Sequence, residues 1–281
     1  MHQIQSDLVS FRELVPEIND TGYLTHAIFY YPAKFIPQVV RYAINTFTKE
    51  EDWIIDPFAG SGTVGLEAYL CKRNALLLDL NPLLNYIIPL KIYPNKERLN
   101  KGRLCELLEG MEQSVHPFMP KWSNVEYWYP QEMLETLSKY WGFAKNIEQN
   151  SYSQIIESVL LKTSKHFSYA EHRIPKLYRS KRKKSYIEDL LKAEWKDKLK
   201  EMVCTLSLKT LQDINNFISI TQKHKNRVEY KGGIDSSYYQ VGHACDALIT
   251  SPPYLQAQEY IRTAKMDLFW LGYIPKKKSE N

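Results

Sequence analysis

The stretch that decides the fold is "EDWIIDPFAGSGTVGLEAYLCKRNALLLDLNP", residues 51–82. A short apolar run, 53–56, ends at a proline and a glycine-rich turn. Residues 63–72 then carry apolar side chains at helical spacing, and 75–79 form a second apolar run that ends in an aspartate. Continuous apolar runs of this length are typical of parallel strands buried on both faces. The stretch therefore predicts a strand, glycine turn, helix and strand, the unit from which α/β sheets are built.

The glycine turn also predicts a ligand site. Gly60 and Gly62 let the backbone turn tightly at the end of the first strand, and they let a ligand approach where a Cβ would clash. Asp79 ends the second strand, about where a carboxylate reaches ribose hydroxyls. The pattern predicts a nucleoside-cofactor site, and a purely structural turn with a surface aspartate is the alternative. A phosphate-loop ATPase is disfavoured because the turn lacks the Gly-Lys-Ser/Thr ending.

A second motif ends another apolar run, 247–250, with Ser251-Pro252-Pro253-Tyr254. Two prolines cannot donate to a sheet, so the strand must end there. At the carboxyl end of a parallel strand, Ser251 would place a hydroxyl in the ligand crevice, beside free backbone carbonyls and the flat face of Tyr254. These groups suit an aromatic ring that carries an exocyclic amine. A proline-terminated strand without a function is the alternative.

Between these motifs the pattern is almost wholly helical, from residue 82 to about 224, and strand signals return at 227–231. A structureless connection of that length would be implausible, so the insertion is expected to form its own subdomain. We therefore expect an α/β scaffold interrupted by helices. The expected parts are a cofactor-binding part (1–90), a helical insertion (91–225) and a continuation of the scaffold (226–281).

Charge is distributed unevenly along the chain. Residues 162–227 hold 17 Lys or Arg and 7 Asp or Glu, whereas the whole chain has a net charge of +5. A basic segment on an otherwise acidic protein indicates a polyanion partner, and a solvated helix face is the alternative. Phosphate contacts position a protein without reading sequence. The candidate phosphate-binding residues are Arg173, Lys176, Arg179, Lys181, Arg182, Lys183 and Lys184.

Other residue types narrow the class of protein. The four cysteines form no Cys-x-x-Cys pair, which is typical of reduced thiols in a cytosolic protein. The seven histidines show no metal-ligand spacing, so we expect no metal. The chain shows no signal-peptide pattern and no apolar run of membrane-spanning length. We expect a soluble, cytoplasmic protein with no membrane partner.

Together, "DPFAGSGT" (56–63) and "SPPY" (251–254) resemble the amino-group DNA methyltransferases, which use S-adenosylmethionine. The resemblance implies a seven-stranded, Rossmann-like methyltransferase fold in which the first motif binds the cofactor and the second is catalytic. "HAIFYYPAKF" (26–35) resembles the segment that covers the methionine part of the cofactor. Asp79 matches the acidic ribose contact. Asp235 matches a group placed against the adenine, although Gly-Asp reads Gly-Ile-Asp here.

The resemblance assigns two sets of site residues. The cofactor set is Tyr31, Pro32, Lys34, Phe35, Asp56, Pro57, Phe58, Gly60, Gly62, Thr63, Asp79 and Asp235. The catalytic set is Ser251, Pro252, Pro253 and Tyr254. Serine before Pro-Pro is similar to enzymes that methylate the amino nitrogen (N4) of cytosine in double-stranded DNA. Methylation of adenine N6, methylation of RNA, and a non-catalytic DNA-binding subunit are the alternatives.

The resemblance also raises an expectation of incompleteness. Only four of the seven strands can be placed, and the strand before Ser251 would be a bare apolar edge in the family's strand order. An apolar helix over 266–273 would also lack a partner surface. We expect a second polypeptide that completes the fold, a truncated product or a non-catalytic subunit, and little activity from the chain alone. The family also implies a cognate restriction endonuclease.

Overall fold

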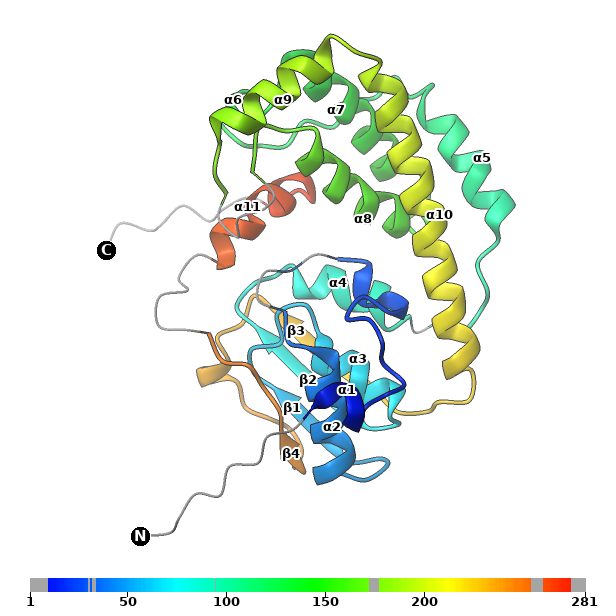
Figure 1. Cartoon of the computed structure of the whole chain (residues 1–281), viewed down its shortest axis with the longest axis vertical. Helices are drawn as coiled ribbons and strands as arrows, with labels where there is room; N and C mark the ends of the chain where they lie inside the picture. Colours follow the sequence, from blue (N-terminus) through cyan, green and yellow to red (C-terminus); the bar gives the residue numbers. More distant parts are fainter. Residues whose placement is uncertain are drawn as a thin grey trace. The chain divides into compact units, whose positions relative to one another are not determined.

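The computed structural model describes residues 10–29, 31, 34–93, 95–171, 177–253 and 260–273. The chain forms two compact units, here called the sheet unit (1–96 and 216–253) and the helical unit (97–215 and 254–281) (Figure 1). Most of the helical insertion belongs to the second of these units. The described residues after 259, expected to continue the scaffold, group with the helical unit.

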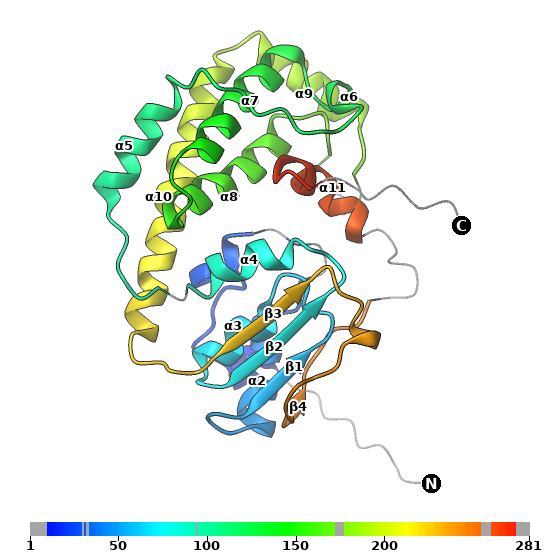
Figure 2. The same ribbon diagram turned by 180° about the vertical axis from the view of Figure 1, so that it is seen from behind.

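The sheet unit is built on four parallel strands in the order β3-β2-β1-β4 (Figure 2). Their bounds are β1 Trp53–Asp56, β2 Asn74–Asp79, β3 Val228–Gly232 and β4 Ala247–Leu248. The register pairs Ile54 with Ala75 and with Ala247. This arrangement is the expected Rossmann-like methyltransferase sheet, with a helical insertion between β2 and β3.

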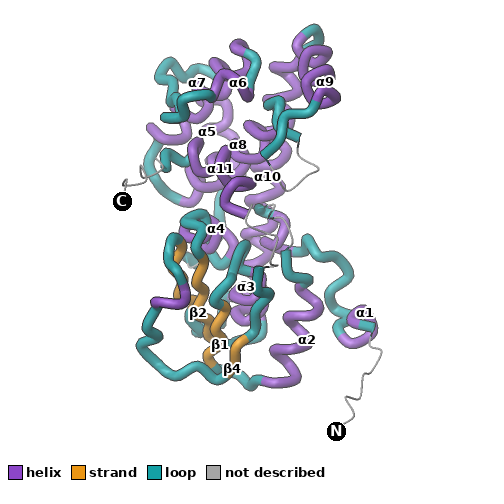
Figure 3. The backbone as a smooth tube through the Cα atoms, turned by 90° about the vertical axis from the view of Figure 1, so that its left-hand side faces the viewer, coloured by secondary structure: helices purple, strands orange, loops and turns teal. Residues whose placement is uncertain are grey.

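Helices cover one face of the sheet (Figure 3). Leu77 of β2 is fully buried on this face, and a Cβ at Gly65 of α3 would lie 2.4 Å from its Cδ1. The glycine therefore allows close packing of helix on strand. The elements of this layer are α1 Phe11–Leu14, η1 Leu24–Ala27, α2 Pro37–Phe47, α3 Thr63–Leu70 and α4 Leu84–Lys91.

Within the described residues of the sheet unit, a loop lies on the opposite face. It runs from β3 to β4 and includes η2 Ser236–Tyr238. His243 of this loop packs on Trp53 with ring centroids 4.0 Å apart, and Tyr239 lies under the ammonium of Lys231 at 4.9 Å. The edge strand β4 pairs with β1 alone in the described part of the chain, and Leu248 is 63% exposed. Among the described residues, this edge of the sheet is therefore unpaired, as expected.

The helical unit has an aromatic core. Trp141 and Trp270 stack with centroids 5.4 Å apart, and Ser164 accepts a hydrogen bond from the Trp141 indole. Side chains cap three helices, with Asn100, Asn150 and Ser180 accepting from backbone N–H groups of the first turn. The helices are α5 Lys101–Met111, α6 Val125–Trp128, α7 Gln131–Asn146, α8 Ser151–His166, α9 Lys181–Leu191, α10 Trp195–Thr221 (which continues into the sheet unit) and α11 Tyr260–Trp270.

The helix α11 contains the apolar segment near the end of the chain. This segment was expected to lack a partner surface, and that expectation was wrong. Phe269 of α11 stacks on Trp122 with centroids 4.9 Å apart, and the Trp270 indole donates to Tyr129 Oη at 2.8 Å. The insertion itself therefore supplies the partner surface. None of the described helices is long and apolar enough to cross a membrane.

Candidate active site at the carboxyl ends of the strands

The glycine turn after β1 has the backbone that its sequence predicts. Gly60 and Gly62 have φ values of +53° and +72°, in the left-handed region that side chains disfavour. A Cβ at Gly62 would lie 2.1 Å from Ile88 Cδ1, and one at Gly60 would lie 3.1 Å from the ring of Tyr31. The turn thus needs both glycines, and it brings Tyr31 from the predicted covering segment against Gly60.

Asp79 organises this turn from the end of β2. Its Oδ2 accepts the Gly60 N–H and its Oδ1 accepts the Asn81 N–H, both at 2.7 Å. Burial raises the pKa of Asp79. A carboxylate has about four acceptor positions, so two remain for ligand hydroxyls. The neighbouring Asn81 Nδ2 is a buried donor with no partner among the described residues, so it is available to a polar group or a water.

The serine motif is joined to the glycine turn by a contact that the sequence did not predict. Thr250 Oγ1 donates to Asp56 Oδ1 at 2.7 Å, and the same oxygen accepts the Phe58 N–H at 3.1 Å. Asp56 is 2% exposed. Burial raises its pKa to about 7, against the hydrogen bonds from Thr250 and Phe58. One buried carboxyl therefore touches both motifs, and Ser251 follows directly after Thr250.

Asp235 is placed differently from the other carboxylates. Gly233 and Ile234 donate their N–H groups to the Asp79 carbonyl at 2.9 and 3.1 Å, so the loop after β3 reaches the end of β2. The Asp235 carboxylate itself is exposed and accepts from Ser237 N and Oγ. This hydrogen bonding to Ser237 lowers the pKa of Asp235. The structure brings the loop to the site and turns the Asp235 side chain toward its own turn.

The covering segment is held by Lys34. Its ammonium donates to the carbonyls of Thr21 and His26, each at 3.1 Å. Burial lowers the pKa of Lys34 to about 8, opposed by the charges of Glu67 and Asp20. Of the remaining cofactor set, Phe35 is half-buried, Thr63 is buried and Phe58 is 42% exposed. Four of the predicted residues lie outside the described part of the chain: Pro32, Arg173, Lys176 and Tyr254.

A buried polar cluster behind the turn was also missed from sequence. Glu67 of α3 is fully buried and accepts from Tyr23 Oη, from His26 Nε2 at 2.6 Å and from Arg41 Nε at 2.7 Å. Burial alone would raise the pKa of Glu67, but these partners outweigh burial and lower it. The cluster ties the helix after the glycine turn to the segment that leads into Tyr31. The one sequence feature that could have indicated this cluster is the single glutamate in the apolar helix 63–70.

This cluster makes the fold sensitive to acid. Burial lowers the pKa of His26 to about 4, against the pull of Glu67, so the folded state holds the neutral ring. The unfolded ring binds a proton near pH 6.5, and the associated stability is lost as the pH falls from about 6.5 to about 4. We expect the stability advantage of the wild type over His26→Gln to fall across this window, by at most about 1.4 kcal/mol per pH unit. Urea denaturation at several pH values measures it, and an advantage that stays constant would contradict it.

In the basic stretch of the helical unit, some cationic side chains are held by contacts within the unit and others are exposed. Lys183 is 2% exposed and donates to the His166 carbonyl at 2.6 Å. Arg179 lies over the rings of Tyr127 and Tyr169, at 4.5 and 4.3 Å, and donates to the Tyr127 carbonyl. These two side chains serve the fold of the unit. More exposed are Lys181, Arg182 (paired with Glu171) and Lys184 (paired with Glu188).

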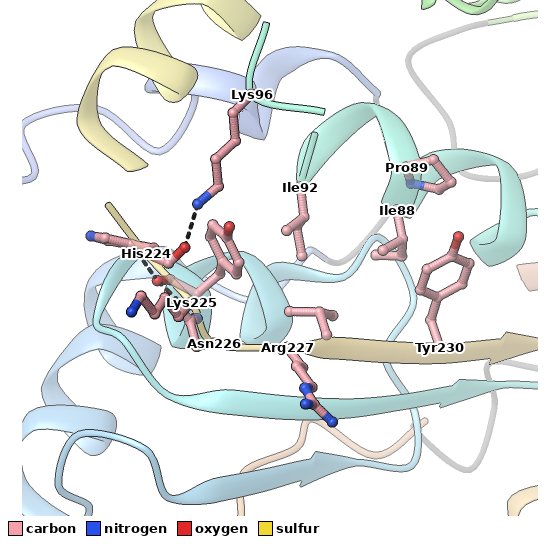
Figure 4. A pocket seen from close by; sticks show the side chains of 11 residues that line it. Ile88, Pro89, Ile92, Lys96, His224, Lys225, Asn226, Arg227 and Tyr230 are labelled. Atoms are coloured by element: carbon pink, nitrogen blue, oxygen red, sulfur yellow. Dashed lines mark hydrogen bonds between the residues drawn. The ribbon is translucent and has the colours of Figure 1, made fainter. Parts of the chain in front are cut away.

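A hollow of about 580 Å³ lies elsewhere in the sheet unit (Figure 4). It is bounded by Ile88 and Ile92 near α4 and by Tyr230 of β3, and Lys96 closes one end by donating to the His224 carbonyl. It reaches the amino end of β3 and includes none of the predicted site residues. The hollow is therefore separate from the predicted site, whose motif residues lie at the other end of the strands.

Part of the chain is similar to known DNA methylases. Residues 12–88, which contain the covering segment, the glycine turn and Asp79, match the DNA methylase family. The Type II methyltransferase M.MvaI of Kocuria varians is 22% identical, over 90% of this chain and 58% of its own length. M.BsoBI of Geobacillus stearothermophilus is 24% identical, over all of this chain and 59% of its own length.

A third relative is the Type II methyltransferase M.MjaII of Methanocaldococcus jannaschii, 28% identical over 53% of this chain and 28% of its own length. No solved structure gives a significant match. The chain spans about three fifths of the length of the first two relatives. The matches support a DNA methyltransferase.

Proposed function

We propose that this chain carries the cofactor-binding and catalytic parts of an S-adenosylmethionine-dependent DNA methyltransferase that methylates cytosine N4 in duplex DNA. The hydrogen bond from Thr250 to Asp56 carries the proposal, because it joins the serine motif to the glycine turn. Asp79 holds the same turn through Gly60. A methyl donor and an amine acceptor need to meet at one edge of a parallel sheet, and these two motifs end there.

The residues fit the cofactor. Gly60 and Gly62 leave room for close approach, and the spare acceptor positions of Asp79 suit ribose hydroxyls. The unpartnered Asn81 Nδ2 offers a donor nearby. Tyr31 and Lys34 would cover the amino-acid part, with Phe35, Thr63 and Asp235 as further proposed contacts. S-adenosylmethionine, when bound, supplies a methyl group on a sulfonium that needs no protein nucleophile.

The chain's own task is to position and polarise the target amine. The cytosine amine is a poor nucleophile because its lone pair is delocalised into the ring. Ser251 Oγ and the Pro252 carbonyl would accept its two hydrogens and aim the lone pair at the methyl group. Catalysis then comes from orientation and electrostatics, and no covalent enzyme intermediate forms. The base has to leave the duplex to reach Ser251, and Tyr254 is proposed to stack on it.

The test is methyl transfer from isotopically labelled S-adenosylmethionine to duplex DNA by the chain together with any partner polypeptide that transfer requires, followed by digestion to nucleosides and mass spectrometry. We expect the label in N4-methylcytosine. Label in N6-methyladenine would correct the base, and label in RNA alone would contradict a DNA substrate. Cofactor and DNA binding without any transfer would favour the non-catalytic subunit.

We further propose that the exposed cations of α9 bind DNA phosphates, together with Arg173 and Lys176. Replacing Lys181 and Lys184 with glutamine should weaken binding to all sequences alike and flatten the slope of log K against log salt, by about 0.9 per lost phosphate contact. Lys192→Gln, at the other end of α9, is the matched control. Lys183→Gln should instead destabilise the unit, because its ammonium is buried. Fluorescence anisotropy at several salt concentrations measures this, and a loss confined to one cognate site would contradict it.

We also propose a protein partner at the edge of the sheet. The outer edge of β4 is unpaired among the described residues, and Leu248 of this strand is exposed, a combination that invites addition of a strand. A second polypeptide that supplies further strands would cover it. The relatives are named as Type II methyltransferases. For this chain we therefore also propose a cognate restriction endonuclease as a partner and a cytoplasmic location.

A further inference from the structure

The strand that carries the catalytic motif is held by few backbone bonds. β4 has only two residues, Ala247 and Leu248, and it is an edge strand of the described sheet. Beyond its ladder, Ile249 donates to the Ile55 carbonyl at 3.1 Å. Short edge strands are where local opening is easiest, because few hydrogen bonds and few apolar contacts hold them. The position of Ser251 therefore depends on side chains that secure β4.

Two side chains fasten β4 to β1, one at each end. Before the strand, Asp246 Oδ2 accepts the Trp53 N–H at 2.8 Å, and the Asp246 N–H donates to the Trp53 carbonyl at 2.8 Å. After the strand, Thr250 Oγ1 donates to Asp56 Oδ1 at 2.7 Å. The second contact directly precedes Ser251, so it governs the direction in which the chain enters the Ser-Pro-Pro turn.

The chemistry of the second contact makes it a precise constraint. Threonine is branched at Cβ, so its χ1 angle is restricted and its hydroxyl has a defined direction. Asp56 is 2% exposed and also accepts the Phe58 N–H, so it cannot swing away without breaking the start of the glycine turn. Pro252 and Pro253 stiffen the chain on the other side. Ser251 is thus held between an anchored residue and a rigid pair.

We propose that Thr250 is a positioning residue, which fixes Ser251 for the target amine and links it through Asp56 to the glycine turn. The inference rests on the proposed function for its catalytic meaning, but the link itself belongs to the fold. A misplacement of about 1 Å far from the reacting atoms can cost about 10²-fold in rate. Loss of this link should therefore lower turnover much more than it lowers cofactor affinity.

The test uses Thr250→Val, which keeps the branched shape and removes the hydroxyl, and Thr250→Ser, which keeps the hydroxyl. Thr163→Val is the control, because it also removes a hydroxyl that donates a hydrogen bond, but to carbonyls of its own helix in the helical unit. Amide hydrogen exchange of the intact chain without cofactor comes first. We expect Thr250→Val to speed exchange about tenfold or more at Ile249 and Phe58, whose N–H groups donate to β1 and to Asp56, and Thr250→Ser and Thr163→Val to leave both unchanged. Unchanged exchange in Thr250→Val would overturn the inference.

Kinetics with S-adenosylmethionine and duplex DNA follow. We expect kcat of Thr250→Val to fall about 10- to 100-fold, with the cofactor Kd and the KM for DNA within about threefold of wild type, and Thr250→Ser to recover most of the rate. Equal losses in both Thr250 variants would overturn the positioning role. If wild type binds no S-adenosylmethionine, the proposed function fails, and the exchange result still decides whether Thr250 holds the strand.

Discussion

Replacing Ser251 with alanine is expected to lower the rate of methyl transfer by about 10²- to 10³-fold. Removal of one positioned group that stabilises a transition state typically costs this much. In our account, Ser251 Oγ accepts a hydrogen of the target amine as its nitrogen becomes pyramidal. The contact strengthens along the reaction, so kcat should fall while KM changes little. Single-turnover methyl transfer to duplex DNA, assayed with any partner polypeptide that transfer requires, is the measurement.

The affinity for the cofactor is the control measurement for Ser251→Ala. Ser251 follows β4, whereas the proposed cofactor contacts lie on the turn after β1 and at the end of β2. The Kd for S-adenosylmethionine should therefore stay within about threefold of the wild-type value, well below one factor of ten. A full methyl-transfer rate in Ser251→Ala would contradict the catalytic role of the motif, and a parallel loss of cofactor binding would indicate a folding defect.

Replacing Glu67 with alanine is expected to destabilise the protein by about 3–5 kcal/mol, because it leaves buried partners uncompensated. Arg41 would lose the acceptor of its Nε–H, and His26 and Tyr23 would each lose theirs. Urea denaturation of the intact chain gives the change in the free energy of unfolding. An exchange experiment should also show faster exchange in 23–27, the segment that the cluster ties to α3.

The matched control is Glu50→Ala. Glu50 also pairs with a cation, Lys72 at 2.9 Å, but more than half of each side chain is exposed. Exposed ion pairs contribute little, so this variant should unfold at nearly the wild-type urea concentration. Similar midpoints for the two variants would show that the Glu67 cluster is not a main support of the sheet unit.

Much of the sheet unit follows from local sequence signals. The apolar runs at 53–56 and 75–79 form β1 and β2, and the glycines between them adopt positive φ. These features are set within a few residues, since a strand buried on both faces has to be apolar and a left-handed turn favours glycine. The comparison over 12–88 and the parallel sheet confirm the fold class.

What sequence did not show depends on partners far along the chain. Thr250 and Asp56 are 194 residues apart, and their residue types alone do not predict the hydrogen bond between them. Lys183 belongs to a run of four cations, yet the fold buries it and exposes Lys181. The helix α11 finds its partner in Trp122, within the insertion. Spacing predicts elements, but the packing of elements decides which polar side chains meet.

The carboxyl ends of β1 and β2 are proposed to form an S-adenosylmethionine site. Calorimetric titration of S-adenosylmethionine into the purified chain tests it most directly. Asp79→Ala removes the acceptors beside Gly60, and Asp52→Ala removes a carboxylate that accepts the Lys49 N–H at the other end of β1. We predict binding at one site, a loss of about tenfold or more in affinity for Asp79→Ala, and no change for Asp52→Ala. A folded wild-type chain that gives no binding heat and no competition by a labelled cofactor, or an Asp79→Ala variant that binds as well as wild type, would contradict the account.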